Sequence, residues 1–413
     1  NSSSESIGTP DTQRSVLFDD LTEDSFDLTV VENPYILVVG GLGYIGSHTT
    51  LELLKASYNV VVIDDLSNSF SAVLDRVILL ASEYCKSDNK PLPSVDFHEV
   101  DYKDSSAIRA ILSKYDISES ISKNSVAPRS SRIAGVIHFA AFKSVEESIE
   151  KPLPYYRNNV CGLVDFLDVL QEFGIKNFVF SSSATVYGSK ANSGVPLSEE
   201  HMVHHPESYF DSRGDVQFAE PGVSGITSPY GRTKYMCEAI LADLAHSDPS
   251  WSITLLRYFN PVGCHESGLL GEHPRQRPTN LVPVVIRVLT GQLSELNVYG
   301  TDYDTADGTA VRDFIHVQDL ACGHIAALDA AARGTIKGFR AYNLGTGRGH
   351  TVREVVMSLE KASNQGIPAR EVGRRKGDVG FCVAAVDRAE TELNWKAEKT
   401  LEDCARDVWR YTE

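Results

Sequence analysis

The sequence predicts an α/β fold: a doubly wound parallel sheet followed by a second, smaller mixed α/β domain. Two observations support this prediction. Between residues 35 and 259, short apolar runs alternate with stretches of helical periodicity, a pattern typical of strands buried between helices in a parallel sheet. After about residue 260 the pattern becomes mixed and richer in Gly and Pro, which indicates a second and smaller domain.

The apolar runs give the expected strands in order. They are residues 35–39, 59–64, 95–100, 135–140, 176–181 and 251–259. Helical periodicity occurs at residues 42–57, 154–173 and 234–246. Because parallel neighbours need crossover connections, these elements are expected to form right-handed βαβ units. The polar segment 189–228 is interpreted as a long surface loop.

Composition and charge exclude several classes of function. The chain has 413 residues, a formal net charge of −17 and no apolar run long enough to cross a bilayer. We therefore expect no binding to nucleic acid or to a membrane. The seven cysteines are scattered and include no CxxC pair, which favours free thiols in a reducing compartment, here the cytoplasm, and predicts no zinc site.

A glycine-rich turn follows the first predicted strand. Residues 38–47 read VVGGLGYIGS, in which Gly40, Gly43 and Gly46 precede a predicted helix. These glycines allow a tight turn and let backbone N–H groups approach a pyrophosphate at the helix N-terminus. Asp64 ends the next strand, where a carboxylate binds a ribose and disfavours a 2′-phosphate. The motif predicts a Rossmann domain that binds NAD rather than NADP, with Asp101 as a candidate for the adenine amine.

Two further motifs predict the chemistry. In SPYGRTK (228–234), Tyr230 and Lys234 share one helical face. On its own this pair fits either a Tyr packed on the core under a Lys stem, or an acid/base in which the ammonium lowers the pKa of the phenol. FSSSATVYG (180–188) follows a strand and offers hydroxyl groups at the carboxyl edge of the sheet. With a nicotinamide these are the parts that hydride transfer from a secondary alcohol needs, so the catalytic interpretation is favoured.

These motifs resemble those of one enzyme family. From about residue 35 to the C-terminus the chain carries, in order, GGLGYIGSHTT, VIHFAAFKSVEESIEKPLPYY, FVFSSSATVYG, SPYGRTK, LLRYFNPVG, DYDTADGTAVRDFIHVQDLACGHIAAL and YNLGTGRG. This series is similar to the UDP-glucose 4-epimerases of the extended short-chain dehydrogenase/reductase superfamily. The resemblance implies an isomerase of galactose metabolism that oxidises a UDP-sugar reversibly at C4 with bound NAD, and a homodimer.

The resemblance also implies a division of the chain. Residues 34–259 are expected to bind NAD, and residues 260–413 to bind the nucleotide sugar, with some return of the chain to the first domain. Residues 1–33 carry eight Asp or Glu against one Arg, so we expect a disordered acidic tail.

The family's roles carry over onto the matching positions. Tyr230 is expected to be the acid/base at the sugar 4-oxygen, and Lys234 to hold the nicotinamide ribose and lower the pKa of Tyr230. Ser183, with Thr185 beside it, is expected to bind the 4-hydroxyl. The implied cofactor contacts are Gly40, Gly43, Tyr44, Ile45, Gly46, Asp64, Asn68, Asp101, Phe139, Lys143, Asn159, Tyr230, Lys234 and Tyr258. The implied substrate contacts are Ser183, Tyr230, Phe259, Asn260, Asn280, Leu281, Asn297, Tyr299, Arg312, Arg375, Asp378 and Cys382.

Some positions depart from the family pattern. Val39 replaces a Thr of the glycine turn, and Glu146 replaces a Gly near the expected phosphates. Arg275 lies in a stretch that differs from the family just before Asn280. Cys382 stands where a Tyr would close the pocket beside the sugar 2-position, so N-acetylated UDP-sugars are expected as further substrates.

Alternative functions fit the sequence less well. A nucleotide-sugar 4,6-dehydratase would carry an acidic pair after Thr185, where this chain has Val186 and Tyr187. UDP-glucuronate decarboxylase, and a non-catalytic NAD-sensing scaffold, remain open as alternatives. The segments HMVHHP (201–206) and DYDTADG (302–308) match neither a zinc motif nor a complete EF-hand loop, so no metal is expected.

Overall fold

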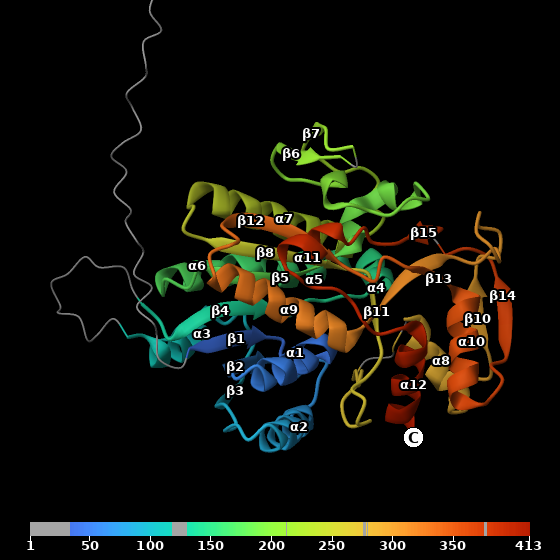
Figure 1. Ribbon diagram of the computed structural model, residues 1–413, viewed down its shortest axis with the longest axis horizontal. Helices are drawn as coiled ribbons and strands as arrows, with labels where there is room; N and C mark the ends of the chain where they lie inside the picture. Colours follow the sequence, from blue (N-terminus) through green and yellow to red (C-terminus); the bar gives the residue numbers. More distant parts are fainter. Residues whose placement is uncertain (1–33, 118–129, 212, 276–277, 279, 376–377) are drawn as a thin grey trace, which may run out of the picture. The chain divides into compact units, whose positions relative to one another are not determined.

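The computed structural model describes residues 34–413, apart from 118–129, 212, 276–277, 279 and 376–377 (Figure 1). The predicted acidic tail, residues 1–33, lies outside the described residues.

A seven-stranded sheet, ordered β12-β8-β5-β4-β1-β2-β3, forms the larger of two domains (Figure 1). All neighbouring strands are parallel. The strands are β1 Tyr35–Val39, β2 Asn59–Asp64, β3 Val95–Glu99, β4 Ile133–His138, β5 Asn177–Ser183, β8 Ser252–Tyr258 and β12 Gly338–Leu344. The direction of winding reverses between β1 and β4, which is the point where such sheets bind ligands at their carboxyl edge.

Helices cover both faces of this sheet (Figure 1). One face is covered by α1 Tyr44–Lys55, α2 Ala72–Ser87 and α9 Val317–Ala332, and the other by α3 Ser105–Leu112, α6 Gly162–Glu172 and α7 Pro229–Ser247. The alternation of side chains along each strand feeds both cores, since Val60 and Val62 pack on the first face and Val61 and Ile63 on the second. The predicted doubly wound fold is confirmed.

The second domain is smaller and mixed. Its strand β11 pairs with β9, β13 and β15, and β10 pairs with β14. Its elements are β9 Asn260–Val262, α8 Leu281–Leu289, β10 Leu296–Tyr299, β11 Val311–His316, β13 Gly349–Thr351, α10 Val352–Ser363, β14 Ala369–Val372, β15 Phe381–Cys382 and α12 Leu401–Thr412. A separate apolar core joins α8, α10 and α12. Between these elements the chain returns to the first domain as α9 and β12, and α11 Asp387–Glu392 follows β15.

Two segments differ from the expected secondary structure. The helix expected at 154–173 is continuous over residues 152–172 but contains a π-helical stretch: α5 Pro152–Tyr155, the π-helical Tyr156–Cys161 and α6 follow one another without a break, and a short α4 Val145–Glu150 precedes them. The expected loop 189–228 is folded: short 3₁₀ turns, Ala184–Asn192 and Glu199–His201, lead into a hairpin of β6 Glu207–Phe210 and β7 Val216–Ala219. Sequence analysis missed this hairpin, in which the apolar side chains of Phe210, Val216 and Phe218 are exposed instead of packed on a core.

Candidate active site

The glycine turn brings β1 and α1 into direct contact. Gly40 has a φ of +77°, which favours glycine. A Cβ on Gly46 would lie 2.2 Å from the carbonyl oxygen of Gly40, so α1 packs on the turn without room for a side chain. Tyr44 and Ile45 form the first turn of α1, and the Tyr44 hydroxyl donates a hydrogen bond to the carbonyl of Gly263 (2.6 Å). This contact joins the turn to the second domain.

Asp64 connects two turns at the carboxyl edge of the sheet. Its carboxylate accepts hydrogen bonds from the backbone N–H groups of Leu42 (3.0 Å) and Leu66 (2.9 Å) and from the Ser69 hydroxyl (2.7 Å). The glycine turn is therefore held against the turn after β2, in which Asn68 lies half-buried. A ribose hydroxyl would share a carboxylate that the chain has already oriented.

Other residues expected at the cofactor already have partners within the chain. Asp101 accepts a hydrogen bond from the backbone N–H of Lys103 and forms an ion pair with its ammonium (3.0 Å). Lys143 follows β4 and forms an ion pair with Glu272 (3.1 Å). The Lys143 side chain is 54% exposed, so solvent screens this pair and the pair adds little to stability.

The amide of Asn159 is hydrogen-bonded on both sides within the chain. Its amide oxygen accepts hydrogen bonds from the Phe142 N–H (2.9 Å) and the Asn158 amide (3.1 Å). Its amide nitrogen donates to the Phe142 carbonyl and to the Thr233 hydroxyl (3.0 Å each). Because an amide offers two donors and two acceptors, the buried side chain is fully used within the chain. Asn159 therefore ties the segment after β4 to helix α7, and its expected contact with the cofactor stays a prediction.

The predicted catalytic residues come together where α7 begins. Ser228 caps the helix by accepting a hydrogen bond from the Gly231 N–H (3.2 Å). In the first turn of α7, Tyr230 lies close enough to Ser183, at the end of β5, for this serine to lower the pKa of the phenol. The Thr185 hydroxyl donates to the Ser183 hydroxyl oxygen (3.0 Å). The Lys234 ammonium, almost fully buried, donates to the carbonyl of Ser181.

Burial dominates the pKa values of Tyr230 and Lys234. Burial raises the pKa of Tyr230 to about 12, and the hydrogen bond from Ser183 only partly opposes it. Burial lowers the pKa of Lys234 to about 8. Desolvation therefore dominates the pKa of the phenol in the chain alone, and the lowering of that pKa by Lys234 stays a prediction for the complete site.

Three expected residues extend from the end of β8. The buried Tyr258 hydroxyl is hydrogen-bonded to Nε2 of His324, whose Nδ1 lies 2.8 Å from the Leu320 carbonyl. The carbonyl requires a proton on Nδ1, so Nε2 accepts and Tyr258 donates. Phe139 packs against the same imidazole in a tilted arrangement, with 4.8 Å between the ring centroids and 48° between the ring planes. His324 was missed by sequence analysis, since nothing local connects it to Tyr258.

Phe259, which follows Tyr258, brings the sugar-side candidate Cys382 next to the catalytic strands. Phe259, Ala184 and Cys382 belong to one buried apolar cluster, and Asn260 begins β9 beside them. Phe381 is on the other face of its strand, where its ring lies 3.9 Å from the Cβ position of Gly349. The smaller residue of the pair therefore faces the cluster.

A pair of arginines meets one carboxylate in the second domain. Arg312 on β11 donates to Oδ1 of Asp378 (2.7 Å), and Arg375 lies 3.5 Å from Oδ2. The Arg375 guanidinium also lies 4.7 Å from the ring centroid of Tyr299. In the chain alone, the carboxylate of Asp378 thus bridges Arg312 and Arg375; its expected contact with the ligand stays a prediction. The remaining candidates lie around it: Asn297 accepts from Arg370 (3.0 Å), Asn280 precedes α8 as its N-cap, and Leu281 begins that helix.

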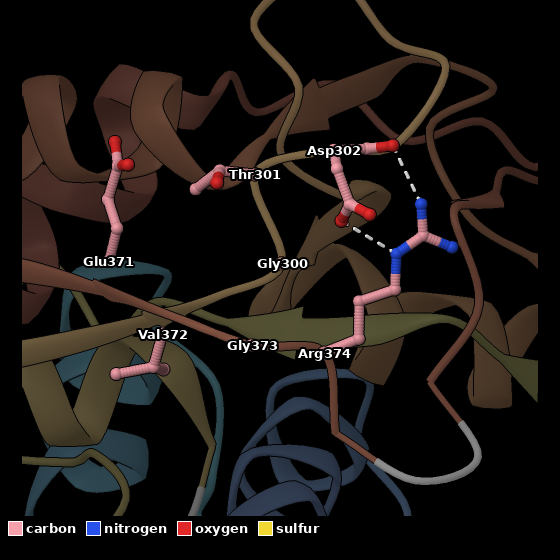
Figure 2. A pocket seen from close by; sticks show the side chains of 7 residues that line it. All are labelled: Gly300, Thr301, Asp302, Glu371, Val372, Gly373 and Arg374. Atoms are coloured by element: carbon pink, nitrogen blue, oxygen red, sulfur yellow. Dashed lines mark hydrogen bonds and ion pairs between the residues drawn. The ribbon is translucent and has the colours of Figure 1, made fainter.

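A cavity of about 310 Å³ opens beside this group (Figure 2). It is lined by Gly300, Thr301, Asp302, Glu371, Val372, Gly373 and Arg374. Figure 2 shows Arg374 reaching across to Asp302, where it donates to the carboxylate (2.8 Å) and to the carbonyl (2.7 Å). The cavity follows β10 and β14, next to Tyr299 and Arg375, and its lining includes none of the catalytic candidates.

A buried ion pair behind the catalytic residues was also missed. Glu238, one turn after Lys234, accepts two hydrogen bonds from the Arg257 guanidinium (3.1 and 2.8 Å) and one from the Ser182 hydroxyl. The spacing of Tyr230, Lys234 and Glu238, four residues apart in each step, is the sequence signal that points to this carboxylate.

The residues that the structure describes were also compared with the requirements of a metal site and of a membrane-spanning helix. Among them, no group of three or more His, Cys, Asp or Glu side chains is arranged to hold a metal. No helix among the same residues is both long and apolar enough to span a membrane.

Comparison with known proteins agrees with this geometry. Residues 36–345 match the model of the NAD dependent epimerase/dehydratase family. The chain is 45% identical to UDP-glucose 4-epimerase 2 of Arabidopsis thaliana, covering 91% of this chain and 94% of that protein. It is 43% identical to the human UDP-glucose 4-epimerase, covering 91% and 95%. The crystal structure of the Bifidobacterium longum UDP-glucose 4-epimerase, in complex with NAD+ and UDP, superimposes with a TM-score of 0.75 at 41% identity over 91% of this chain and 97% of that one. The chain therefore belongs to the NAD-dependent epimerase/dehydratase family and, within it, to the UDP-glucose 4-epimerases.

Proposed function

We propose that the protein interconverts UDP-galactose and UDP-glucose by transient, NAD-dependent oxidation at C4 of the sugar. The observation that carries this proposal is the meeting of Tyr230 and Lys234 on α7 with Ser181 and Ser183 on β5, at the edge of the sheet where its winding reverses. Curated relatives that share more than 40% identity over nine-tenths of the chain give the substrate.

The residues present fit a dinucleotide. The glycine turn leaves no room for a Cβ on Gly46, and it presents the free N–H groups of the first turn of α1, which suit a pyrophosphate. Asp64, held by two backbone N–H groups, suits the adenosine ribose. Tyr230 and Lys234 would face the nicotinamide end. When bound, NAD accepts the hydride of C4 and returns it.

The chain's own task is to move one proton and to hold the sugar. Tyr230 takes the proton of the 4-hydroxyl and later returns it to the same oxygen, while Ser183 donates a hydrogen bond there. To accept that proton, Tyr230 must reach a pKa far below about 12. The ammonium of Lys234 stabilises the phenolate once it forms, because opposite charges attract strongly in a buried site. Epimerisation then requires the 4-keto sugar to turn its other face before the hydride returns.

Arg312 and Arg375 are proposed to bind the diphosphate. In the chain alone both arginines contact Asp378, so their side chains are preoriented but their charge is partly compensated. An incoming diphosphate offers bidentate acceptors to each guanidinium.

On this basis residues 34–259 serve mainly the cofactor and residues 260–413 mainly the UDP-sugar. The small side chain of Cys382, next to Phe259, supports the further proposal that N-acetylated UDP-sugars are accepted.

A cytoplasmic homodimer is proposed for the assembled enzyme. Its support is a set of apolar side chains that are 39–66% exposed along α4–α7: Val145, Ile149, Leu153, Val164 and Met236. Burying such side chains against a second copy would be favourable. All seven cysteines are free thiols, which fits a reducing compartment.

The test is direct. Purified protein is incubated with UDP-galactose, and the products are resolved by NMR or chromatography. The proposal expects a stable mixture of UDP-galactose and UDP-glucose, reached from either side, without net consumption of NAD. A UDP-4-keto-6-deoxy sugar or a UDP-pentose as the product would contradict it.

A further inference from the structure

The folded segment between the two catalytic motifs reaches the buried side of α7 through His204. This imidazole lies 3.0 Å, measured from Nε2, from Oε2 of Glu238, and its side chain is only 4% exposed. Its ring packs against Tyr235 of α7 and Phe339 of β12, with centroid separations of 5.0 and 6.0 Å. The next residue, His205, is 41% exposed and faces the exposed Asp243 instead.

The carboxylate that His204 contacts is ionised. Burial raises the pKa of Glu238, but the charge of Arg257 and the hydrogen bonds from His204 and Arg257 outweigh it and hold that pKa at about 2. An ionised carboxylate only accepts hydrogen bonds, so Nε2 of His204 carries a proton and donates it. Both oxygens of Glu238 are thereby fixed, Oε1 by Ser182 and Arg257, and Oε2 by Arg257 and His204.

Glu238 adds a third contact between the catalytic helix α7 and the catalytic strand β5. Three successive turns of α7 face three successive serines of β5: Lys234 donates to the Ser181 carbonyl, Glu238 accepts from the Ser182 hydroxyl, and Tyr230 lies beside Ser183, which lowers the pKa of the phenol. A rotation or slide of α7 that changes one of these contacts changes all three, because both elements are rigid. Displacing a catalytic group by about 1 Å can cost on the order of 100-fold in rate.

We propose that His204 is a positioning residue for epimerisation: by donating to Glu238 it fixes α7 against β5 and keeps Tyr230 aligned with Ser183. This rests on the proposed function and adds to it a residue from the segment 189–228, outside both catalytic motifs. The role is mechanical, because His204 acts on α7 through Glu238.

The experiment compares His204→Leu, His204→Gln and His204→Asn in the full chain. A Gln side chain places an amide N–H near the position of Nε2, whereas Leu fills the space without a donor and Asn is too short. We expect His204→Leu to lower kcat for UDP-galactose about 10-fold with little change in KM or in NAD content. His204→Gln should recover most of the loss, and His205→Leu, the matched control, should stay within twofold of wild type. If the Leu variant does not fold, the Asn variant takes its place.

Hydrogen exchange in the peptide covering residues 228–247 gives a second readout, independent of activity. Exchange should accelerate in His204→Leu and not in His204→Gln or His205→Leu. The inference is overturned if the Leu or Asn variant keeps the wild-type kcat, if it changes only KM, or if Gln is no better than Leu. If wild-type protein fails to turn over UDP-galactose, the proposed function fails, and the exchange data alone still decide whether His204 fixes α7.

Discussion

The ammonium of Lys234 donates its hydrogen bond to the carbonyl of Ser181 at the end of the catalytic strand. A buried lysine whose hydrogen-bond partner is a neutral carbonyl loses hydration without gaining an opposite charge, so its charged form lowers the stability of the folded chain. Such a loss of stability is common at active sites. The effect of this buried charge on the stability of the protein can therefore be measured without any substrate.

Lys234→Met should raise the free energy of unfolding near pH 7. Burial lowers the pKa of Lys234 from 10.5 to about 8, so between these values the folded chain holds fewer protons than the unfolded one and stability rises with pH. Below pH 8 the full penalty, about 3 kcal/mol, is present in wild type and absent in the variant. The advantage of Lys234→Met should therefore be largest at pH 7 and shrink toward pH 10.5, as measured by urea unfolding. Lys361→Met, at an exposed position of α10, is the control, and a pH-independent advantage of Lys234→Met would contradict the buried ammonium.

Tyr230→Phe should separate binding from chemistry. The ring and its packing are kept while the proton-transferring oxygen is lost, so kcat should fall by at least about 100-fold with NAD content retained. Tyr235→Phe, on the same helix, keeps its contact with His204 and should retain most of the activity. Near-normal turnover by Tyr230→Phe would remove Tyr230 from the mechanism.

Substituting the glycines of the turn should distinguish packing from ligand contact. An added Cβ at Gly46 would lie 2.2 Å from the Gly40 carbonyl oxygen, whereas at Gly43 the nearest atom, the same oxygen, lies at 3.4 Å. Gly46→Ala should thus lower Tm and the NAD content of purified protein together, and Gly43→Ala should leave the Tm of the NAD-free protein nearly unchanged. Equal Tm values for both variants would show that the turn can accommodate a Cβ at position 46, contrary to the expected clash with the Gly40 carbonyl oxygen.

Cys382→Tyr should narrow the substrate range. The larger ring would fill the cluster next to Phe259, so turnover of UDP-N-acetylgalactosamine should be lost and that of UDP-galactose largely spared. Phe381→Tyr is a matched control because residue 381 lies on the other face of the strand. Absence of N-acetyl turnover in wild type would mean that another group closes the pocket.

Replacing the exposed phenylalanines of the hairpin should have little effect on stability. Phe210 and Phe218 are each 75% exposed, so they bury little surface in the monomer. For the double variant Phe210→Ser/Phe218→Ser we expect a change within about 0.5 kcal/mol per site and unchanged kcat. Thermal unfolding and the epimerase assay check this, and a large loss of Tm would show that the rings pack on the body of the enzyme.

Sequence reasoning was accurate where the physical cause is local. A buried parallel strand is a continuous apolar run, as in Val60–Ile63, and helical spacing alone brings Tyr230 and Lys234 to one face. It failed where the cause is long-range. The partners of Glu238, Tyr258 and Asn159 come from distant parts of the chain, so their roles could not be inferred from spacing. The effect of burial on the pKa of Tyr230 could not be predicted either, because burial depth is a property of the folded chain.

The pairing of β12 with β8 has a consequence for biosynthesis. Every residue of Ser252–Tyr258 has a partner in Gly338–Leu344, so the larger sheet is completed by a strand that is made only after β9, α8, β10, β11 and α9. While the ribosome is still translating the intervening residues, β8 presents an open, apolar edge that can pair with another nascent chain. A premature stop codon anywhere between 259 and 338 should therefore give an insoluble product and not a working half-enzyme.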